Sequence, residues 1–156
     1  MTSTTTTRPG REPATTTTTT TTTTGGPLRA VRLLLGGSAL LILLQGLWAG
    51  LFLEHDGQRG AAGSWITMHA RGGELAILLA GAATVVAFVK LRGRTDLWGG
   101  SAVLTAVLVL ESYLGGLIRD AGRNTLTAVH VPLAMALMGL AVWLPLRARR
   151  PMDAGV

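Results

Sequence analysis

Two histidines stand inside long apolar stretches of this 156-residue chain, where an imidazole is costly without a partner. His69 occurs in "WITMHARGGELAILLAG" and His130 occurs in "LTAVHVPLAMAL". Imidazole is a common ligand of transition metals and of haem iron. It also forms hydrogen bonds between neighbouring helices. His69 and His130 therefore offer two alternatives, iron ligation or helix packing.

The composition restricts the chemistry that these histidines can take part in. The chain has no cysteine, which excludes disulfides, thiolate metal sites, thiol nucleophiles and covalent attachment of a c-type haem. Hydrophobic residues make up 48% of the chain and charged residues only 14%, against about a quarter in soluble domains. The net charge is +6, but the basic residues form small groups beside apolar segments rather than a long patch. We therefore expect a lipid bilayer, and no nucleic acid, as the partner.

Apolar segments long enough to cross a bilayer, which takes about 20 helical residues, cover residues 28–53, 64–89, 97–118 and 125–146. We predict an all-α membrane protein, a four-transmembrane-helix up-down bundle within residues 28–147. The first segment is too long for the apolar core of a signal peptide and has no A-x-A cleavage pattern after it, so we interpret it as an anchor.

The ends of the chain differ from this domain in composition. Residues 1–27 are rich in threonine, with ten in succession at 15–24, and cannot bury enough surface to order themselves. We predict a disordered cytoplasmic tail there; alternatively, the translated protein begins close to residue 28. Residues 148–156 are predicted to form a short basic cytoplasmic tail.

The distribution of lysine and arginine predicts the orientation. Ten basic residues fall on the side of the two termini: Arg8, Arg11, Arg29, Arg32, Lys90, Arg92, Arg94, Arg147, Arg149 and Arg150. Four fall on the other side: Arg59, Arg71, Arg119 and Arg123. The positive-inside rule then places both termini in the cytoplasm of a bacterial plasma membrane.

The two halves of the domain resemble each other. "LQGLWAGLFLE" aligns without gaps on "LESYLGGLIRD", which places Gln45 opposite Glu111. A loop and a helix with an early histidine follow each stretch, and each histidine lies about 7 Å below the outer end of its helix. Two similar hairpins imply a pseudo-twofold axis along the membrane normal. Common repeat origin and chance similarity both remain open for so short a match.

The equal depth of His69 and His130 is what two axial ligands of one haem require. The second and fourth helices of an up-down bundle are diagonal, with axes roughly 11–14 Å apart, which leaves room for one iron between inward imidazoles. We therefore predict that the pair binds a b-type haem for electron transfer or redox sensing. Gly72 and Gly73 would let the macrocycle approach the backbone. Outer arginines would neutralise its propionates: Arg59, Arg71, Arg119 and Arg123.

The alternative is a non-catalytic membrane subunit or assembly partner without a cofactor, in which the polar residues serve helix packing. We expect Glu111 to pair with Gln45 and Glu74 to pair with Arg71, although a proton relay through the glutamates is a further alternative. An enzyme is not expected, because no nucleophile–base constellation is present and the outer loops are short. Expected partners besides lipid are a membrane redox protein or further copies of this chain.

Four short stretches carry a resemblance to a known family: "QGLWAG", "MHARGGE", "ESYLGG" and "VHVPLAMAL". Over about residues 28–150 the chain resembles an uncharacterised family of small bacterial four-helix integral membrane proteins. It is also similar in layout to four-helix b-type cytochromes and to one half of haem A synthase. The resemblance implies the four-helix fold, and the family has no established activity. Glu111 stands where that family favours glutamine.

Overall fold

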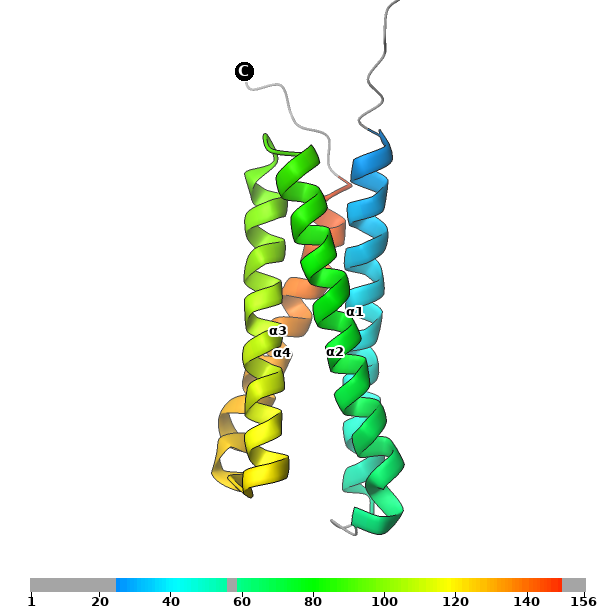
Figure 1. Ribbon diagram of the computed structural model, residues 1–156, viewed down its shortest axis with the longest axis vertical. Helices are drawn as coiled ribbons and strands as arrows, with labels where there is room; N and C mark the ends of the chain where they lie inside the picture. The colour runs from blue at the N-terminus through cyan, green and yellow to red at the C-terminus, as the bar shows by residue number, and fades with distance from the viewer. Residues whose placement is uncertain (1–24, 56–58, 150–156) are drawn as a thin grey trace, which may run out of the picture.

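The computed structural model describes residues 25–55 and 59–149, and the described chain is an all-α four-helix membrane bundle. Four of the described helices have the length and the apolar composition needed to cross a membrane. The helices, shown in Figure 1, are α1 (Gly25–Leu53), α2 (Arg59–Lys90), α3 (Thr95–Ala121) and α4 (Thr127–Arg147), with a 3-10 turn η1 (Asn124–Leu126) before α4. This confirms the predicted fold class. The predicted tails lie outside the described residues, except for residues 25–27 and 148–149. The prediction of disorder is wrong for residues 25–27, because they form the first residues of α1.

Three helices extend beyond the predicted apolar segments by three residues or more, whereas α4 begins at Thr127, two residues later than predicted. α2 begins at Arg59, where residue 64 was expected, and α3 continues to Ala121. An apolar stretch of sequence marks the part of a helix that lies in the hydrocarbon core of the bilayer. The backbone hydrogen bonds of the helix continue into the headgroup region until a residue interrupts them. α3 ends at such a residue, because Gly122 has a φ of 64° and the N–H of Arg123 donates to the Leu117 carbonyl at 3.2 Å. Only glycine adopts this left-handed conformation without strain, so the turn into α4 is sharp.

Packing between the helices follows a ring, α1 against α2, α2 against α3, α3 against α4, and α4 against α1. α2 and α4 are thus diagonal, as expected for an up-down bundle. We call the end where α1 begins and α4 ends the terminal end, and the opposite end the loop end. Figure 1 shows the α1–α2 and α3–α4 hairpins together at the terminal end and apart at the loop end.

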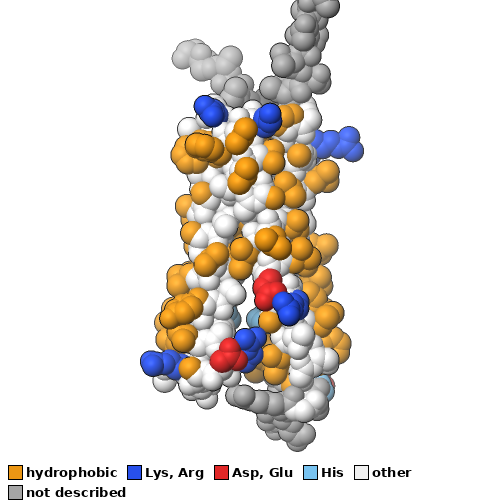
Figure 2. Space-filling view, viewed as in Figure 1, with side chains coloured by type: hydrophobic (Ala, Val, Ile, Leu, Met, Phe, Trp, Pro, Cys, Tyr) orange, Lys and Arg blue, Asp and Glu red, His pale blue; other side chains and the backbone are white. Residues whose placement is uncertain are grey.

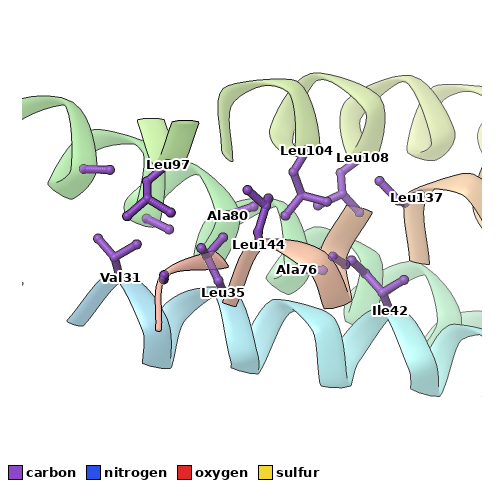
Figure 3. Packing of buried hydrophobic residues seen from close by; sticks show 14 of the residues in the cluster. Val31, Leu35, Ile42, Ala76, Ala80, Leu97, Leu104, Leu108, Leu137 and Leu144 are labelled. Atoms are coloured by element: carbon purple, nitrogen blue, oxygen red, sulfur yellow. The ribbon is translucent and has the colours of Figure 1, made fainter. Parts of the chain in front are cut away.

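The core lies in the half of the bundle toward the terminal end. Alanines at three- and four-residue spacing give α2 a narrow buried face: Ala76, Ala80, Ala83 and Ala87. Leucines and other aliphatic residues of the neighbouring helices fill the space opposite: Val31, Leu35, Ile42, Leu97, Leu104, Leu108, Leu137 and Leu144 (Figure 3). Small residues let helix backbones approach closely where lipid supplies no hydrophobic drive for association.

Polar contacts reinforce this half of the bundle. The buried hydroxyl of Ser38 donates to the Ala76 carbonyl at 3.1 Å and joins α1 to α2. At the terminal end, Asp96 accepts from Arg94 at 3.0 Å and from Arg147 at 3.1 Å. This carboxylate therefore connects the α2–α3 turn with the last turn of α4.

Candidate functional site

The intramembrane polar residues lie immediately beyond the end of the core. On α1 the buried residue Ile42 is followed one turn later by Gln45, and on α3 Leu108 is followed by Glu111. His69 on α2 contacts Gln45, His130 on α4 lies beside Glu111, and the two imidazoles are near enough to interact electrostatically. Figure 2 shows the molecule hollowed between the two hairpins in this half, with histidine side chains visible inside. The structure thus brings the two predicted ligands together on diagonal helices.

The ring of His69 is held by residues of α1. Its Nδ1 lies 3.2 Å from the backbone oxygen of Gln45, and its plane meets the Phe52 ring edge-on with centroids 5.6 Å apart. Protonated on Nδ1, the imidazole donates to this carbonyl and keeps the lone pair of Nε2 unshared. Protonated on Nε2, it accepts at Nδ1 from the Gln45 carboxamide nitrogen, which lies 3.1 Å away in the orientation that satisfies that group. Phe52 was not singled out in the sequence, where an aromatic residue at a helix end has no distinguishing signal.

The side chain of Gln45 docks onto the backbone of α2. In the orientation that satisfies its carboxamide, the NH2 group donates to the His69 carbonyl at 2.7 Å, and the oxygen accepts from the Gly73 N–H at 3.1 Å. These two backbone groups are four residues apart, so the amide bridges one turn of α2. Gln45 therefore positions the turn that carries His69.

Gly72 makes this docking sterically feasible. A Cβ at residue 72 would overlap the Trp48 ring and would lie 2.5 Å from the Gln45 carboxamide. At Gly73 the nearest atom to an added Cβ is in the Gln45 carboxamide, at 3.9 Å. Trp48 and Gln45 thus occupy the space over Gly72 that we had expected a macrocycle to use.

The second hairpin holds its histidine with a carboxylate. Oε2 of Glu111 lies 2.5 Å from Nδ1 of His130, and the two side chains are 8% and 21% exposed. The approach does not have the angles of a regular hydrogen bond, so Nδ1 of His130 and Oε1 of Glu111 are both buried without a hydrogen-bond partner among the described residues. An added Cβ at Gly115 of α3 would lie 3.7 Å from Cε1 of His130, so this glycine leaves space for the ring.

The two hairpins therefore repeat one arrangement. In each, a residue on the first helix approaches Nδ1 of the histidine on the second: Gln45 with His69, and Glu111 with His130. These pairs correct the expected partnership between Gln45 and Glu111. Those two residues lie at equal depth, but on α1 and α3, which are diagonal, so each meets the histidine of its own hairpin.

Paired charges surround the mouth of the hollow (Figure 2). Arg71 and Glu74 form the expected ion pair, with Nη1 and Oε2 2.8 Å apart, and Nε of Arg119 lies 2.7 Å from Oδ1 of Asp120. Arg119 is also attracted by Glu74 across the gap between the hairpins. Arg123 is exposed. Arg71 and Arg119 thus already have carboxylate partners, which a propionate would have to replace.

The donor set distinguishes between a bare metal ion and a haem. The described residues contain no group of three or more His, Asp or Glu side chains placed to hold one metal ion. Protein sites for a bare transition metal generally supply three or four side-chain ligands, whereas a haem iron takes four nitrogens from its own macrocycle and needs one or two more. Two imidazoles therefore fit haem iron better than a bare ion.

The geometry of this site is the available guide to function, since comparison of the chain with protein-family models, with curated proteins and with solved structures finds no match.

Proposed function

We propose that this protein is a b-type haem protein of the bacterial plasma membrane, in which His69 and His130 would hold the haem iron. Its role is one-electron transfer or redox sensing. The observation that carries the proposal is that Nδ1 of each histidine faces an oxygen of the preceding helix, at 3.2 Å from the Gln45 carbonyl for His69 and at 2.5 Å from the Glu111 carboxylate for His130. The His69 contact has hydrogen-bond geometry, and the His130 contact does not. Metal-ligating histidines characteristically make such a contact with the nitrogen that does not bind the metal.

The residues of the chain have distinct parts in this proposal. A bound haem supplies one-electron chemistry at its iron. With Nδ1 protonated, His69 would donate to the Gln45 carbonyl and keep Nε2 available for the iron, and Glu111 lies beside Nδ1 of His130. Phe52, packed edge-on against His69, restricts rotation of that ring. The apolar core beyond the site excludes water from the terminal side.

The orientation follows from the charges and is part of the proposal. Basic residues concentrate at the terminal end, so the positive-inside rule places both termini in the cytoplasm and the haem site toward the outer face of the membrane. Partners that exchange electrons with the site would then approach the loop end, where the rim carries the Arg71–Glu74 and Arg119–Asp120 pairs.

The test is the absorption spectrum of protein purified from haem-replete cells. We expect a Soret band that His69→Ala and His130→Ala each abolish or shift. His55→Ala is the matched control, because Nδ1 of His55 contacts the Leu51 carbonyl at 2.7 Å, just beyond the end of α1 and away from the other two histidines. A folded, colourless wild-type preparation would refute haem binding.

A second candidate is a non-catalytic membrane subunit or assembly partner. It is favoured by the way Gln45 and Trp48 fit over Gly72, which is a packing arrangement between α1 and α2. Under this alternative, His69→Ala lowers thermal stability or partner capture, and metal and haem analysis of the wild type finds neither. The spectrum therefore separates the two candidates.

A further inference from the structure

A groove between α1 and α4 opens at the terminal end, far from the histidines. Its volume is about 710 Å³, and one face of each helix forms its walls. Arginines gather at its end: Arg29 and Arg32 of α1, and Arg149 just after α4. Deeper in, the walls are apolar and include Leu33 and Leu146. The groove thus changes from cationic to apolar along its length.

The length of the groove matches one leaflet of a bilayer. Its α1 wall runs from Gly25 to Ala39, which corresponds to about 21 Å along the helix axis. Half of the hydrocarbon thickness is about 15 Å, and the polar region of one leaflet adds roughly 6 Å. A molecule with one polar end and one apolar chain, oriented as a lipid is, would meet cationic and apolar walls at the appropriate depths.

The positive charge of the groove is uncompensated by the described residues. None of the ion pairs found among residues 25–55 and 59–149 involves Arg29, Arg32 or Arg149. By contrast, Arg94 and Arg147 at the same end share Asp96. An anionic ligand would supply the charge that the groove lacks, and guanidinium groups bind phosphate with charge-assisted hydrogen bonds.

We propose that this groove binds an anionic phospholipid from the leaflet on the side of the termini. The phosphate lies among Arg29, Arg32 and Arg149, and an acyl chain lies along Leu33 and Leu146. A free phosphate would leave most of the groove empty, since the volume is more than twenty times that of one water molecule, about 30 Å³. Basic pockets between transmembrane helices are recurrent sites for such head groups.

Other occupants fit the charges less well. An identical groove of a second copy would bring like charges together. Residues 1–24 contain two arginines and one glutamate, so they carry the same sign as the groove. Residues 150–156 contain one arginine and one aspartate, Arg150 and Asp153, and they follow the groove directly in the chain, which makes this segment the competing occupant to test.

The test is native mass spectrometry of the full chain in detergent, titrated with phosphatidylglycerol and with phosphatidylcholine of the same acyl chains. We expect at least tenfold tighter binding of phosphatidylglycerol. Each arginine contributes about a fivefold change in affinity, so the Arg29→Gln/Arg32→Gln variant should lose roughly 25-fold. The matched control Lys90→Gln/Arg92→Gln removes equal charge at the same end, outside the groove, and should change binding less than twofold.

A second variant tests the apolar part without altering charge. Gly36 lines the groove, and an added Cβ there has no atom within 4 Å, so the Cβ of Gly36→Leu enters open space and the longer side chain would occupy the groove. It should weaken phosphatidylglycerol binding at least fivefold. Equal affinity for both lipids, equal loss in the Lys90→Gln/Arg92→Gln control, or displacement by millimolar inorganic phosphate would each overturn the proposal. So would anionic lipid binding that appears only after residues 150–156 are deleted.

Discussion

Replacing Gly72 with alanine should destabilise the bundle, although alanine is the better helix former. The intrinsic preference favours the variant by about 1 kcal/mol. Against this, the new methyl group overlaps the Trp48 ring, and overpacking of this kind costs about 1–3 kcal/mol. Displacing the Gln45 carboxamide also breaks its bonds to the His69 carbonyl and the Gly73 N–H, each worth about 0.5–1.5 kcal/mol. The expected net loss is about 1–5 kcal/mol.

The neighbouring glycine provides the matched control. An added Cβ at Gly73 meets only the Gln45 carboxamide, at an ordinary contact distance of 3.9 Å. Gly73→Ala also keeps the backbone N–H that Gln45 needs, so it should be neutral or should stabilise the protein by up to about 1 kcal/mol.

Equilibrium unfolding in mixed detergent micelles measures both variants. The double variant Gly72→Ala/Trp48→Ala should recover the steric part of the loss, although it also leaves a cavity. If Gly72→Ala is as stable as Gly73→Ala, Trp48 and Gln45 do not pack over Gly72 as described, and the positioning of His69 by α1 would have to be abandoned.

Three further predictions concern individual polar contacts. Glu111→Gln should raise the reduction potential of a bound haem, because the amide makes the His130 imidazole less electron-donating than the carboxylate does; an unchanged potential in a redox titration would contradict this. Ser38→Ala should cost about 0.5–1.5 kcal/mol of unfolding free energy, because it removes the bond to the Ala76 carbonyl; unfolding titrations should show no loss if that bond is absent. Asp96→Asn should cost about 1 kcal/mol, because both of its arginine partners lose a charge-assisted bond. Because salt screens charge pairs, this last difference should shrink at high ionic strength.

The four spans could be predicted because length and hydropathy alone determine which segments can cross a bilayer. Likewise, the placement of His69 and His130 on diagonal helices follows from the up-down order of the four spans. The wrong pairing of Gln45 with Glu111 arose because equal depth was treated as proximity. Depth fixes a residue along the bundle axis, whereas the ring order of the helices decides which residues meet.

The role of Gly72 could not be predicted for a different reason. A glycine in an apolar helix shows that something approaches closely, but the sequence does not identify what does. The answer depended on Trp48, which belongs to another helix and whose rotamer is set by tertiary packing. The start of α2 at Arg59 was missed because hydropathy reports the hydrocarbon layer, not the end of backbone hydrogen bonding.

The end of the core at Ile42 and Leu108 has a mechanical consequence for the loop end. The polar contacts described at the level of the histidines join helices of the same hairpin, Gln45 with His69 and Glu111 with His130. Between the hairpins, Arg119 of α3 is attracted by Glu74 of α2. Stiffness should therefore fall along the bundle axis, so the separation of the hairpins can change with little cost at the loop end. A ligand bound between the two imidazoles would connect the two hairpins. Backbone amide exchange would then slow most in the half of each helix toward the loop end.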